Sequence, residues 1–491
     1  MDQKYIFNHY YRLRHDHSRT LLFASSYQDA IVNVDKDWVD IIHPIYAMVL
    51  SFFSRPILLD EVEKRIATFF SIHIDVAHSL LTQIIDKDEH FHIVYKGYEN
   101  RFPPNIIVSE EKMNSEIRDY DPSMFLYKSI DLDQTRIVNA PLDITFMVNN
   151  VCLTKCVYCY ADKNRKCSQL DFQTVKRIIQ DAYQCGIRHF SVDGGDFFLY
   201  PYWRDLLVEL KRYNYRPSLV STKYPVSEKD IMDFSTFDVP LQVSIDSFDQ
   251  LLLDRIVGRI PDYSVRIQNS MDCIDKYMYF QIATILTKFN GCISNLNEMY
   301  HRIRTYKHIR KWDIRVGFKS LYTKHDFSEF KVEEQAITAI KEWVDNKQRE
   351  ASFMINFSPG REANFFKSSS GSKDFIGAKC SANSTHMFIL PDGQVTICEQ
   401  LYWNKKFLIG DLTKQTISEV LNSPNALRLA FPTRQDFSEK SVCRNCTLFE
   451  SCTSHMNKCF ANILKVYGID NWDYPDPRCS FAPRSIPSIY V

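Results

Sequence analysis

Three closely spaced cysteines are the residues of this chain best suited to chemistry. Cys152, Cys156 and Cys159 stand in the run CLTKCVYC, a C-x3-C-x2-C spacing that directly follows an apolar, strand-like run at 142–148. A cubane iron–sulfur cluster has four irons and normally takes four thiolates. Three thiolates in one short loop leave one iron without a protein ligand, so that iron can hold a small molecule. The loop therefore indicates chemistry on a bound molecule rather than plain electron storage.

A second group of cysteines lies near the end of the sequence. Its first part reads C-x12-G-x4-C, and the run CRNCTLFESC adds C-x2-C-x5-C. The members are Cys380, Cys398, Cys443, Cys446, Cys452, Cys459 and Cys479. Metal or cluster ligation explains such spacing better than disulfides do in a reducing compartment. A structural zinc knuckle is the alternative for CxxC…C taken alone. The other four cysteines, which are scattered, are expected to be small buried hydrophobes: Cys167, Cys185, Cys273 and Cys292.

Bulk properties exclude several classes of protein. The chain has 491 residues, with 60 basic and 60 acidic side chains and a formal net charge of +0. This length suggests two to four domains. A nucleic-acid-binding protein would usually show a basic bias. The first residues lack the apolar core of a signal peptide, and no stretch is long and apolar enough to span a bilayer. We therefore expect a cytoplasmic protein without nucleic-acid or membrane partners.

The elements that must position the first cysteine loop alternate between strand and helix. Repeated βα units predict a parallel sheet with outer helices, and such barrels carry their active sites at the C-terminal ends of the strands. The cysteine loop has that place relative to the first strand. A helix is expected from Phe172, with Asp171 as its cap and Gly186 at its end. The expected strands are 144–148, 189–192, 217–221, 241–245, 280–286 and 314–317.

The three-cysteine loop and its setting resemble the signature of the radical S-adenosylmethionine (SAM) superfamily. In that family the open iron of a 4Fe–4S cluster chelates the methionine part of SAM. The resemblance implies a partial (β/α)6 TIM-like barrel. The later seven cysteines resemble the SPASM domain, which holds two auxiliary iron–sulfur clusters of the 4Fe–4S type. Mapped by position, Cys380, Cys398 and Cys459 would hold the first and Cys443, Cys446, Cys452 and Cys479 the second. This chain has six residues between Cys452 and Cys459, where relatives usually have three.

The same resemblance assigns SAM contacts and candidate catalytic residues. Tyr158 stands where the family has an aromatic residue beside the adenine. The run VDGGD replaces the family's GGEP, whose backbone and acid contact the methionine amino group. The implied SAM-binding residues are Tyr158, Gly194, Gly195, Asp196, Ser221, Ser244 and Arg259. Asp246 is a candidate contact of SAM or substrate, and Glu399 is a candidate base or substrate contact; a solvated surface acid is the alternative for Glu399.

The N-terminal region, 1–100, has the pattern of a winged helix. Strands are expected at 20–24 and 30–34, followed by three helices within 42–85 and a strand at FHIVY. The third helix is not basic, which disfavours DNA binding. The pattern resembles the peptide-recognition domain of enzymes that mature ribosomally made peptides, which binds a leader peptide as an added strand. A structural cap on the barrel is the alternative. The further expected parts are a linker (101–140), the barrel (141–330), a helical connection (331–375) and the SPASM domain (376–491).

The resemblance implies a peptide-modifying oxidoreductase. SAM would be cleaved reductively to a 5′-deoxyadenosyl radical, which removes hydrogen from a side chain so that a thioether or a carbon–carbon or carbon–oxygen cross-link forms. The implied partners are a precursor peptide with a leader and an electron donor of the flavodoxin or ferredoxin type. Three alternatives remain open. They are a sulfatase-maturase-like protein oxidase that makes formylglycine, a non-enzymatic zinc- or cluster-binding peptide adaptor, and a pseudo-enzyme that binds a peptide.

Overall fold

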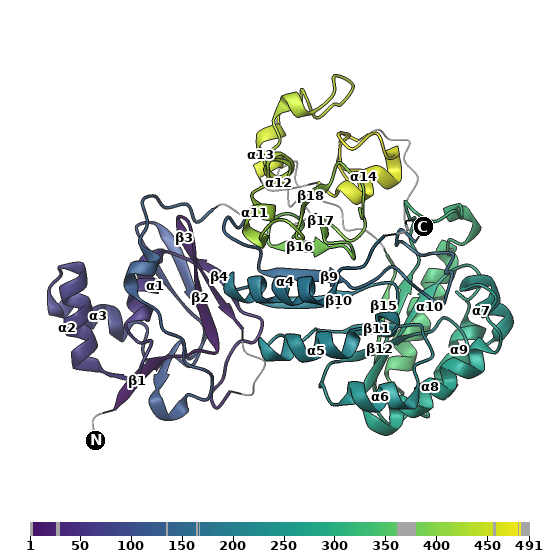
Figure 1. Cartoon of the computed structure of the whole chain (residues 1–491), viewed down its shortest axis with the longest axis horizontal. Coiled ribbons are helices and arrows are strands. Elements are labelled where there is room, and N and C mark those ends of the chain that lie inside the picture. Colours follow the sequence, from purple (N-terminus) through teal and green to yellow (C-terminus); the bar gives the residue numbers. More distant parts are fainter. Residues whose placement is uncertain are drawn as a thin grey trace. The chain divides into compact units, whose positions relative to one another are not determined.

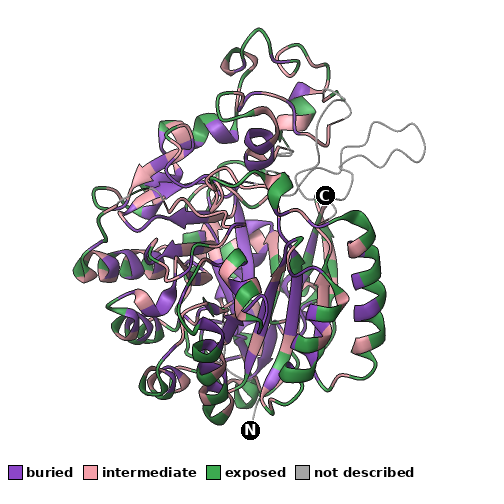
Figure 2. Cartoon of the chain, turned by 90° about the vertical axis from the view of Figure 1, so that its right-hand side faces the viewer, coloured by how far each residue is buried: buried purple, intermediate pink, exposed green. Residues whose placement is uncertain are grey.

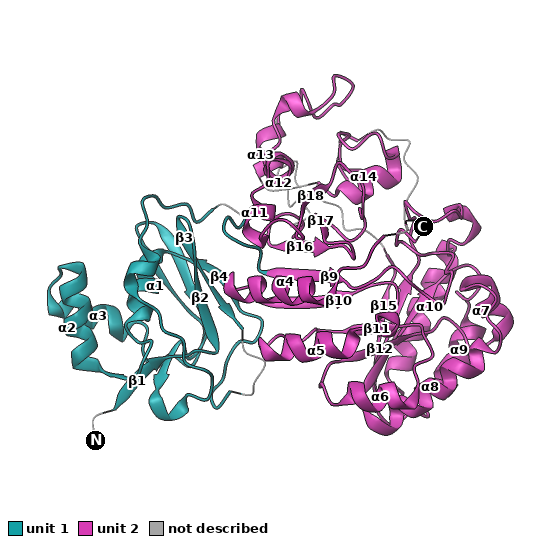
Figure 3. Ribbon diagram, viewed as in Figure 1, with its two compact units in different colours: residues 1–142 teal, residues 143–491 magenta. Residues whose placement is uncertain are grey.

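A computed structural model describes most of the chain and divides it into two compact units (Figure 3). The described residues are 3–25, 30–133, 136–163, 165, 167–360, 380–454, 458–479 and 481–482. Unit 1 is Met1–Leu142 and unit 2 is Asp143–Val491. None of the helices in the described ranges is long and apolar enough to cross a membrane.

Unit 1 combines small antiparallel sheets with three helices. Its central sheet has the order β2-β3-β4, formed by Tyr11–Asp16, Arg19–Ala24 and Val39–Ile42. The expected strand at 20–24 is therefore confirmed. The strand expected at 30–34 is wrong, because Ile31 is 61% exposed and the segment buries no alternating face. The remaining elements are α1 (Pro44–Ser51), α2 (Leu59–Phe70), α3 (Ile74–Thr82), the hairpin β6 (Phe91–Tyr95)–β7 (Tyr98–Phe102), and a sheet of β5 (Ile57–Leu58), β1 (Lys4–Phe7) and β8 (Ile107–Ser109).

Residues 101–140 belong to the same compact unit and help to build its core. Ile106, Ile107 and Phe125 are at most 1% exposed and pack in one cluster with the apolar side chains of α1 and α2. A short 3-10 helix, Pro122–Phe125, begins at Asp121, whose carboxylate accepts from the Ser123 N–H. The prolines that suggest a linker in the sequence thus mark turns within a folded unit.

Unit 2 contains the parallel strands and outer helices that the sequence predicts (Figures 1 and 2). One sheet has the order β11-β12-β13-β14-β15, and β9 pairs in parallel with β10 in another. Buried strands lie inside a layer of helices with exposed outer faces. The strands are β9 (Asp143–Met147), β10 (His189–Asp193), β11 (Val220–Thr222), β12 (Leu241–Ser244), β13 (Phe280–Leu286), β14 (Ile309–Val316) and β15 (Met354–Ser358). The helices are α4 (Phe172–Gln184), α5 (Trp203–Arg212), α6 (Glu228–Ser235), α7 (Gln250–Ile256), α8 (Tyr263–Tyr277), α9 (Ile293–Ile303) and α10 (Glu334–Gln348).

Helix α4 shows how local sequence sets these boundaries. The Asp171 carboxylate accepts from the Thr174 N–H at 3.0 Å, as expected of an N-cap. Gly186 follows the helix with φ = 66°, in the left-handed region that favours glycine. Val175, Ile178, Ile179 and Ala182 form the buried face. The predicted start and end of this helix are thus confirmed.

The cysteine-rich C-terminal region continues the barrel's own sheet. Strand β16 (His386–Ile389) pairs in parallel with β9, and β17 (Gln394–Thr396) and β18 (Leu408–Asp411) extend the order to β10-β9-β16-β17-β18. His386 Nε2 lies 2.9 Å from Thr145 Oγ1 of β9. The described part of this region also contains the short helices α11 (Ile417–Leu421), α12 (Pro424–Ala430), α13 (Phe449–Ser454) and α14 (Phe460–Tyr467). The predicted connection at 331–375 contains α10 and β15, and its part from 361 onward lies outside the described residues.

Candidate active site

The three-cysteine loop leaves the C-terminal end of β9 and is fixed by the end of α7. The Lys155 N–H donates to Val257 O at 2.7 Å, and the Val157 N–H donates to Ile256 O at 2.9 Å. The Cys159 N–H donates to Cys156 O at 3.1 Å, which closes a turn between these two cysteines. The loop is therefore held by main-chain bonds, so its thiols keep their positions without relying on side-chain packing alone.

A lysine that the sequence analysis did not single out lies beside these thiols. Burial raises the pKa of Cys152 to about 12. Burial alone would lower the pKa of Lys163, yet the charges of Cys159, Cys152 and Cys156 raise it. Its ammonium donates to Thr154 O at 3.1 Å. A cation at this position suits a cluster whose thiolates are anionic, so the local donor set fits an iron–sulfur cluster.

Within the described residues, no three His, Cys, Asp or Glu side chains lie close enough together to hold a single metal ion.

The two glycines after β10 lie directly against the cysteine loop. The Gly195 N–H donates to Asn149 O at 2.8 Å. A Cβ on Gly195 would come within 2.2 Å of Val151 O, whereas one on Gly194 would meet Asn149 O at 3.2 Å. Only glycine fits at position 195, because the backbone carrying Cys152 occupies the space of a side chain. The backbone at Gly195 thus packs against the cysteine loop, and the contact of Gly194 and Gly195 with SAM stays a prediction.

The hydrogen-bond acceptor positions of the Asp196 carboxylate are all taken by donors of the protein itself. It accepts from Thr222 Oγ1 at 2.9 Å, from the Lys223 N–H at 2.9 Å and from the Tyr224 N–H at 2.8 Å, and its side chain also caps the Phe198 N–H. Burial raises the pKa of Asp196 to about 6, although these donors act in the opposite direction. Strands β10 and β11 belong to different sheets, so this carboxylate links two strands that share no main-chain ladder. Its predicted contact with the SAM amino group would require it to give up one of these donors.

Asp246 and Tyr158 form a buried network with a second lysine. The Tyr158 O–H donates to Asp246 Oδ2 at 2.6 Å, and Lys223 Nζ donates to the same oxygen at 2.8 Å. The Ile285 N–H donates to Asp246 Oδ1 at 2.9 Å. Asp246 has no exposed surface. Burial and the Asp246 charge raise the pKa of Tyr158. Asp246 thus holds the Tyr158 hydroxyl in place beside the cysteine loop, and its contact with SAM or substrate stays a prediction.

The remaining predicted SAM contacts fall into two places. Ser221 at the end of β11 and Ser244 at the end of β12 lie side by side, with their hydroxyl oxygens 3.1 Å apart. Gln242 Nε2 donates to Ser221 Oγ at 3.0 Å. Arg259 follows α7 and is exposed. Both serines thus lie on the strand ends where the barrel would hold a ligand, and the role of Arg259 stays a prediction.

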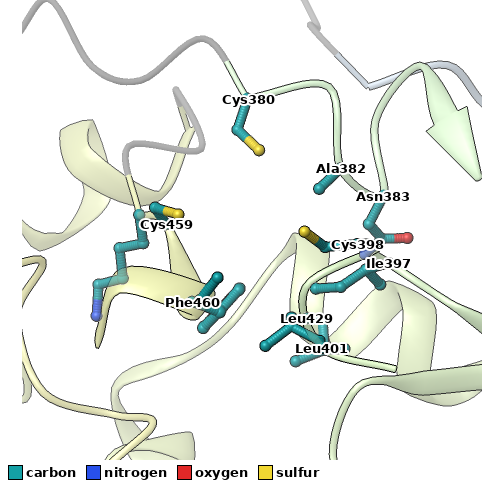
Figure 4. Close-up of a pocket in the computed structure, with 11 residues that line it drawn as sticks. Cys380, Ala382, Asn383, Ile397, Cys398, Leu401, Leu429, Cys459 and Phe460 are labelled. Atoms are coloured by element: carbon teal, nitrogen blue, oxygen red, sulfur yellow. The ribbon is translucent and has the colours of Figure 1, made fainter. Parts of the chain in front are cut away.

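Three cysteines from separate segments of the C-terminal region line one pocket (Figure 4). Cys380, Cys398 and Cys459 surround it, and their sulfur atoms point toward one another. Asn383 and Lys458 are its other polar lining residues. These three cysteines are the set predicted for the first auxiliary cluster. The extra residues before Cys459 therefore do not keep its thiol away from the other two.

The second predicted set also comes together. The charges of Cys443, Cys446 and Cys479 each raise the pKa of Cys452, after burial as the main cause. The two sets are connected through Asp476, whose carboxylate accepts from the Cys459 N–H at 2.8 Å and whose main-chain oxygen accepts from the Cys479 N–H at 2.8 Å. Arg478 Nε donates to Asp476 at 2.8 Å and balances this buried charge.

Acidic and aromatic side chains gather between the first cysteine loop and Cys398. The Asp193 charge is the main cause that raises the pKa of Tyr160, and burial and the Glu399 charge add to it. Burial raises the pKa of Asp193 to about 6. The Tyr160 ring stacks on Phe318 at 5.9 Å between centroids. Tyr402 is 2% exposed, with a positive φ of 41°. Left-handed backbone at a bulky residue is strained and is typical of functional sites.

Of these residues, only Glu399 was predicted from the sequence. Asp193 lies within the VDGGD run, but nothing in its spacing indicates that it faces Tyr160 from β10. Tyr402 follows Cys398 by four residues, in the same segment as Glu399. Their grouping depends on the pairing of β16 with β9, which brings the Cys398 segment beside the barrel strands.

Comparisons with known proteins agree with this geometry. Residues 147–288 match the model of the radical SAM superfamily, and residues 380–447 match the SPASM model, an iron–sulfur cluster-binding domain. A search of curated proteins gives no match. Solved structures of Streptococcus suis SuiB are similar over 97% of this chain and 100% of theirs. The SAM-bound form has 14% identity and a TM-score of 0.59, and the form bound to precursor peptide SuiA has 15% identity and a TM-score of 0.61. At this identity the likeness concerns the fold. The chain thus has the radical SAM fold, with a radical SAM domain at residues 147–288 and an additional C-terminal SPASM domain at residues 380–447.

Proposed function

We propose that this chain is a maturase of ribosomally made peptides, which joins two positions of a precursor peptide by a thioether or by a carbon–carbon or carbon–oxygen cross-link. The observation that carries the proposal is that the cysteine loop at the end of β9 and the three-thiol pocket of the SPASM domain belong to one compact unit, with acidic side chains between them. The similarity to SuiB, which has been solved with its precursor peptide, supports a peptide substrate.

The residues present fit the cofactors that the family implies. Cys152, Cys156 and Cys159 would hold the SAM-binding cluster, and the two later cysteine sets would hold the auxiliary clusters. With SAM bound, the first cluster supplies a 5′-deoxyadenosyl radical when an electron donor of the flavodoxin or ferredoxin type reduces it. The Asp246–Lys223 pair holds Tyr158 beside the cysteine loop, and Ser221 and Ser244 offer hydroxyl groups to the ribose and carboxylate of SAM.

Acidic side chains of this protein would accept the proton that is released when the cross-link forms. Formation of a cross-link removes two hydrogen atoms from the peptide: one leaves as an atom, and the other leaves as a proton and an electron. Asp193 and Glu399 are the carboxylates placed to accept this proton. Burial raises the pKa of Asp193 to about 6, so this carboxyl group can take up a proton near neutral pH and release it again, as general bases do.

Unit 1 would recognise the leader peptide at the edge of its central sheet. Strand β4 ends the order β2-β3-β4, and the Ile41 N–H donates to the Asp40 carboxylate at 2.8 Å instead of to a neighbouring strand. Arg101 Nε of β7 lies 2.8 Å from the same carboxylate. An extended leader peptide can displace the Asp40 side chain from the Ile41 N–H and pair with β4 through main-chain hydrogen bonds. The helices offer no basic recognition face, so the winged-helix pattern here suits a peptide better than DNA.

The substrate class is tested with synthetic precursor peptides, chosen from any short reading frames that neighbour the gene for this chain. We expect the anaerobically reconstituted enzyme, given SAM and dithionite, to yield 5′-deoxyadenosine and a peptide lighter by two hydrogen atoms. Tandem mass spectrometry then locates the new bond between two residues. Formylglycine in the product would instead support a sulfatase-maturase-like oxidase. Bound zinc without SAM cleavage would support the adaptor, and a folded, cluster-loaded chain that fails to cleave SAM would support a pseudo-enzyme.

The leader site is tested with Ile41→Pro. Proline removes the outward-facing N–H of the edge strand and is tolerated at sheet edges. We expect leader binding, measured by fluorescence anisotropy with the labelled peptide, to weaken about 10-fold or more. The loss of the main-chain hydrogen bond between β4 and the leader removes about 1.4 kcal/mol or more of the binding free energy. Ile41→Val keeps the N–H and should bind as the native chain does. Equal affinity of the two variants would rule out β4 as the leader edge.

A further inference from the structure

Lys458 lies between the two sets of cysteines in the SPASM domain. It belongs to the segment between Cys452 and Cys459, which has six residues in this chain. Its ammonium Nζ lies 3.3 Å from Cys443 Sγ, a member of the second set. The same side chain lines the pocket formed by Cys380, Cys398 and Cys459, the first set. The ammonium therefore contacts a ligand of one proposed cluster, and the residue that carries it lines the site of the other.

The position of this ammonium is fixed by packing. Its Nζ lies 4.1 Å from the centroid of the Phe437 ring, a distance at which a cation is attracted to the ring face. Phe437 is itself 2% exposed and packs edge-on against Phe449 at 5.2 Å. Lys458 also directly precedes Cys459, the N-cap residue of α14. Its main chain and side chain are thus both held at the junction of the two sets.

Asp476, the buried acid that bonds to both cysteine sets, already has a cationic partner. Asp476 accepts from the Cys459 N–H, and Arg478 holds both of its carboxylate oxygens, at 2.8 Å through Nε and at 2.9 Å through Nη2. Asp476 is therefore already balanced by its own arginine. The positive charge of Lys458 remains available to the thiolates around it.

We propose that Lys458 is a charge shared by the two auxiliary cluster sites and that it raises the reduction potentials of both. The inference rests on the assignment of the seven cysteines to two clusters in the proposed function. One-electron reduction makes a cluster more negative by one unit, and a nearby ammonium stabilises the reduced form. Hydrogen bonds to the ligating sulfurs act in the same direction and set cluster potentials together with net charge. The lysine thus favours electron acceptance by the auxiliary clusters after each cross-link forms.

The test is a redox titration of the cluster-loaded enzyme followed by electron paramagnetic resonance. We expect Lys458→Met to move the midpoint potentials of both auxiliary clusters to more negative values at unchanged iron content, and Lys458→Arg to keep them near the native values. Lys440→Met is the matched control, because Lys440 is an exposed lysine of the same region. It should leave all potentials unchanged.

Each alternative outcome has a defined meaning. Unchanged potentials in Lys458→Met at full iron content would overturn the proposal, as would a shift in only one of the two clusters. If Lys458→Met loses iron, Lys458→Gln and Lys458→Arg are compared at equal iron content, and equal potentials in these two would overturn it. A native enzyme with well under about twelve irons would contradict the cluster assignment itself, independently of the lysine.

Discussion

The triple variant Cys152→Ala/Cys156→Ala/Cys159→Ala should lose SAM cleavage completely and about four irons per chain. These cysteines form the only cysteine group at the end of a barrel strand within the described residues, and no other thiol is positioned to replace them. The measurement is 5′-deoxyadenosine formation under dithionite, with iron, sulfide and zinc counted on the same samples. The auxiliary sites lie in other segments, so the remaining irons, about eight, should stay bound.

Cys292→Ala is the matched control for this loss. Cys292 lies before α9 and belongs to neither group, and it is exposed, so the expectation that it is a buried hydrophobe is wrong. Its replacement should change neither the iron content nor the rate of SAM cleavage. Continued formation of 5′-deoxyadenosine by the triple variant would contradict the assignment of the cysteine loop. Loss of all irons would indicate misfolding, and a single Cys156→Ala chain would then be measured for SAM cleavage at matched auxiliary-cluster content.

Replacement of Lys223 by methionine should destabilise the barrel by about 3–5 kcal/mol. Lys223 is 15% exposed and Asp246 is 0% exposed, so methionine would leave a buried carboxylate without its cation. The Tyr158 O–H and the Ile285 N–H would remain as its donors. The expected result is a clear fall in melting temperature, together with weaker SAM binding as Tyr158 loses its fixed position.

Two further variants separate the cause of this effect. Lys223→Met/Asp246→Asn removes both charges and should recover most of the lost stability. Lys276→Met breaks a pair with Glu228 in which the side chains are 61% and 50% exposed, and should cost less than about 1 kcal/mol. If Lys223→Met melts like Lys276→Met, the buried pair has no special role in holding the strand ends.

Some parts of this protein could be predicted from the sequence because their causes are local. The C-x3-C-x2-C spacing places three thiols in one loop whatever the rest of the chain does. Asp171 and Gly186 set the ends of α4 through bonds within a few residues of each other. The apolar runs of the barrel strands are buried by helices on the same βα units. For these reasons the fold class and the outer helices are confirmed. The cysteine loop follows the first barrel strand as expected, and its role as a cluster site stays a prediction.

Other parts depend on contacts between residues distant in the sequence. Asp196 and Asp246 look alike in the sequence, as acids after strand ends, yet one links β10 to β11 and the other holds Tyr158. Nothing in the local sequence marks Lys223 as important, because its partner Asp246 lies twenty-three residues later in the chain. Residues 101–140 have the composition of a linker, but the apolar side chains among them fill the core of unit 1.

The sequence by itself determined which residues carry the chemistry, because ligand type and spacing are properties of the chain alone. It identified ten cysteines in two groups and the glycine pair Gly194 and Gly195 as candidate SAM contacts. Only the tertiary structure decided how these groups meet. The pairing of β16 with β9 brings Glu399 and Tyr402 toward Tyr160 and Asp193, and the segment before α14 places Cys459 with Cys380 and Cys398. Strand pairing across more than two hundred residues follows from the packing of the whole unit, which no local pattern encodes.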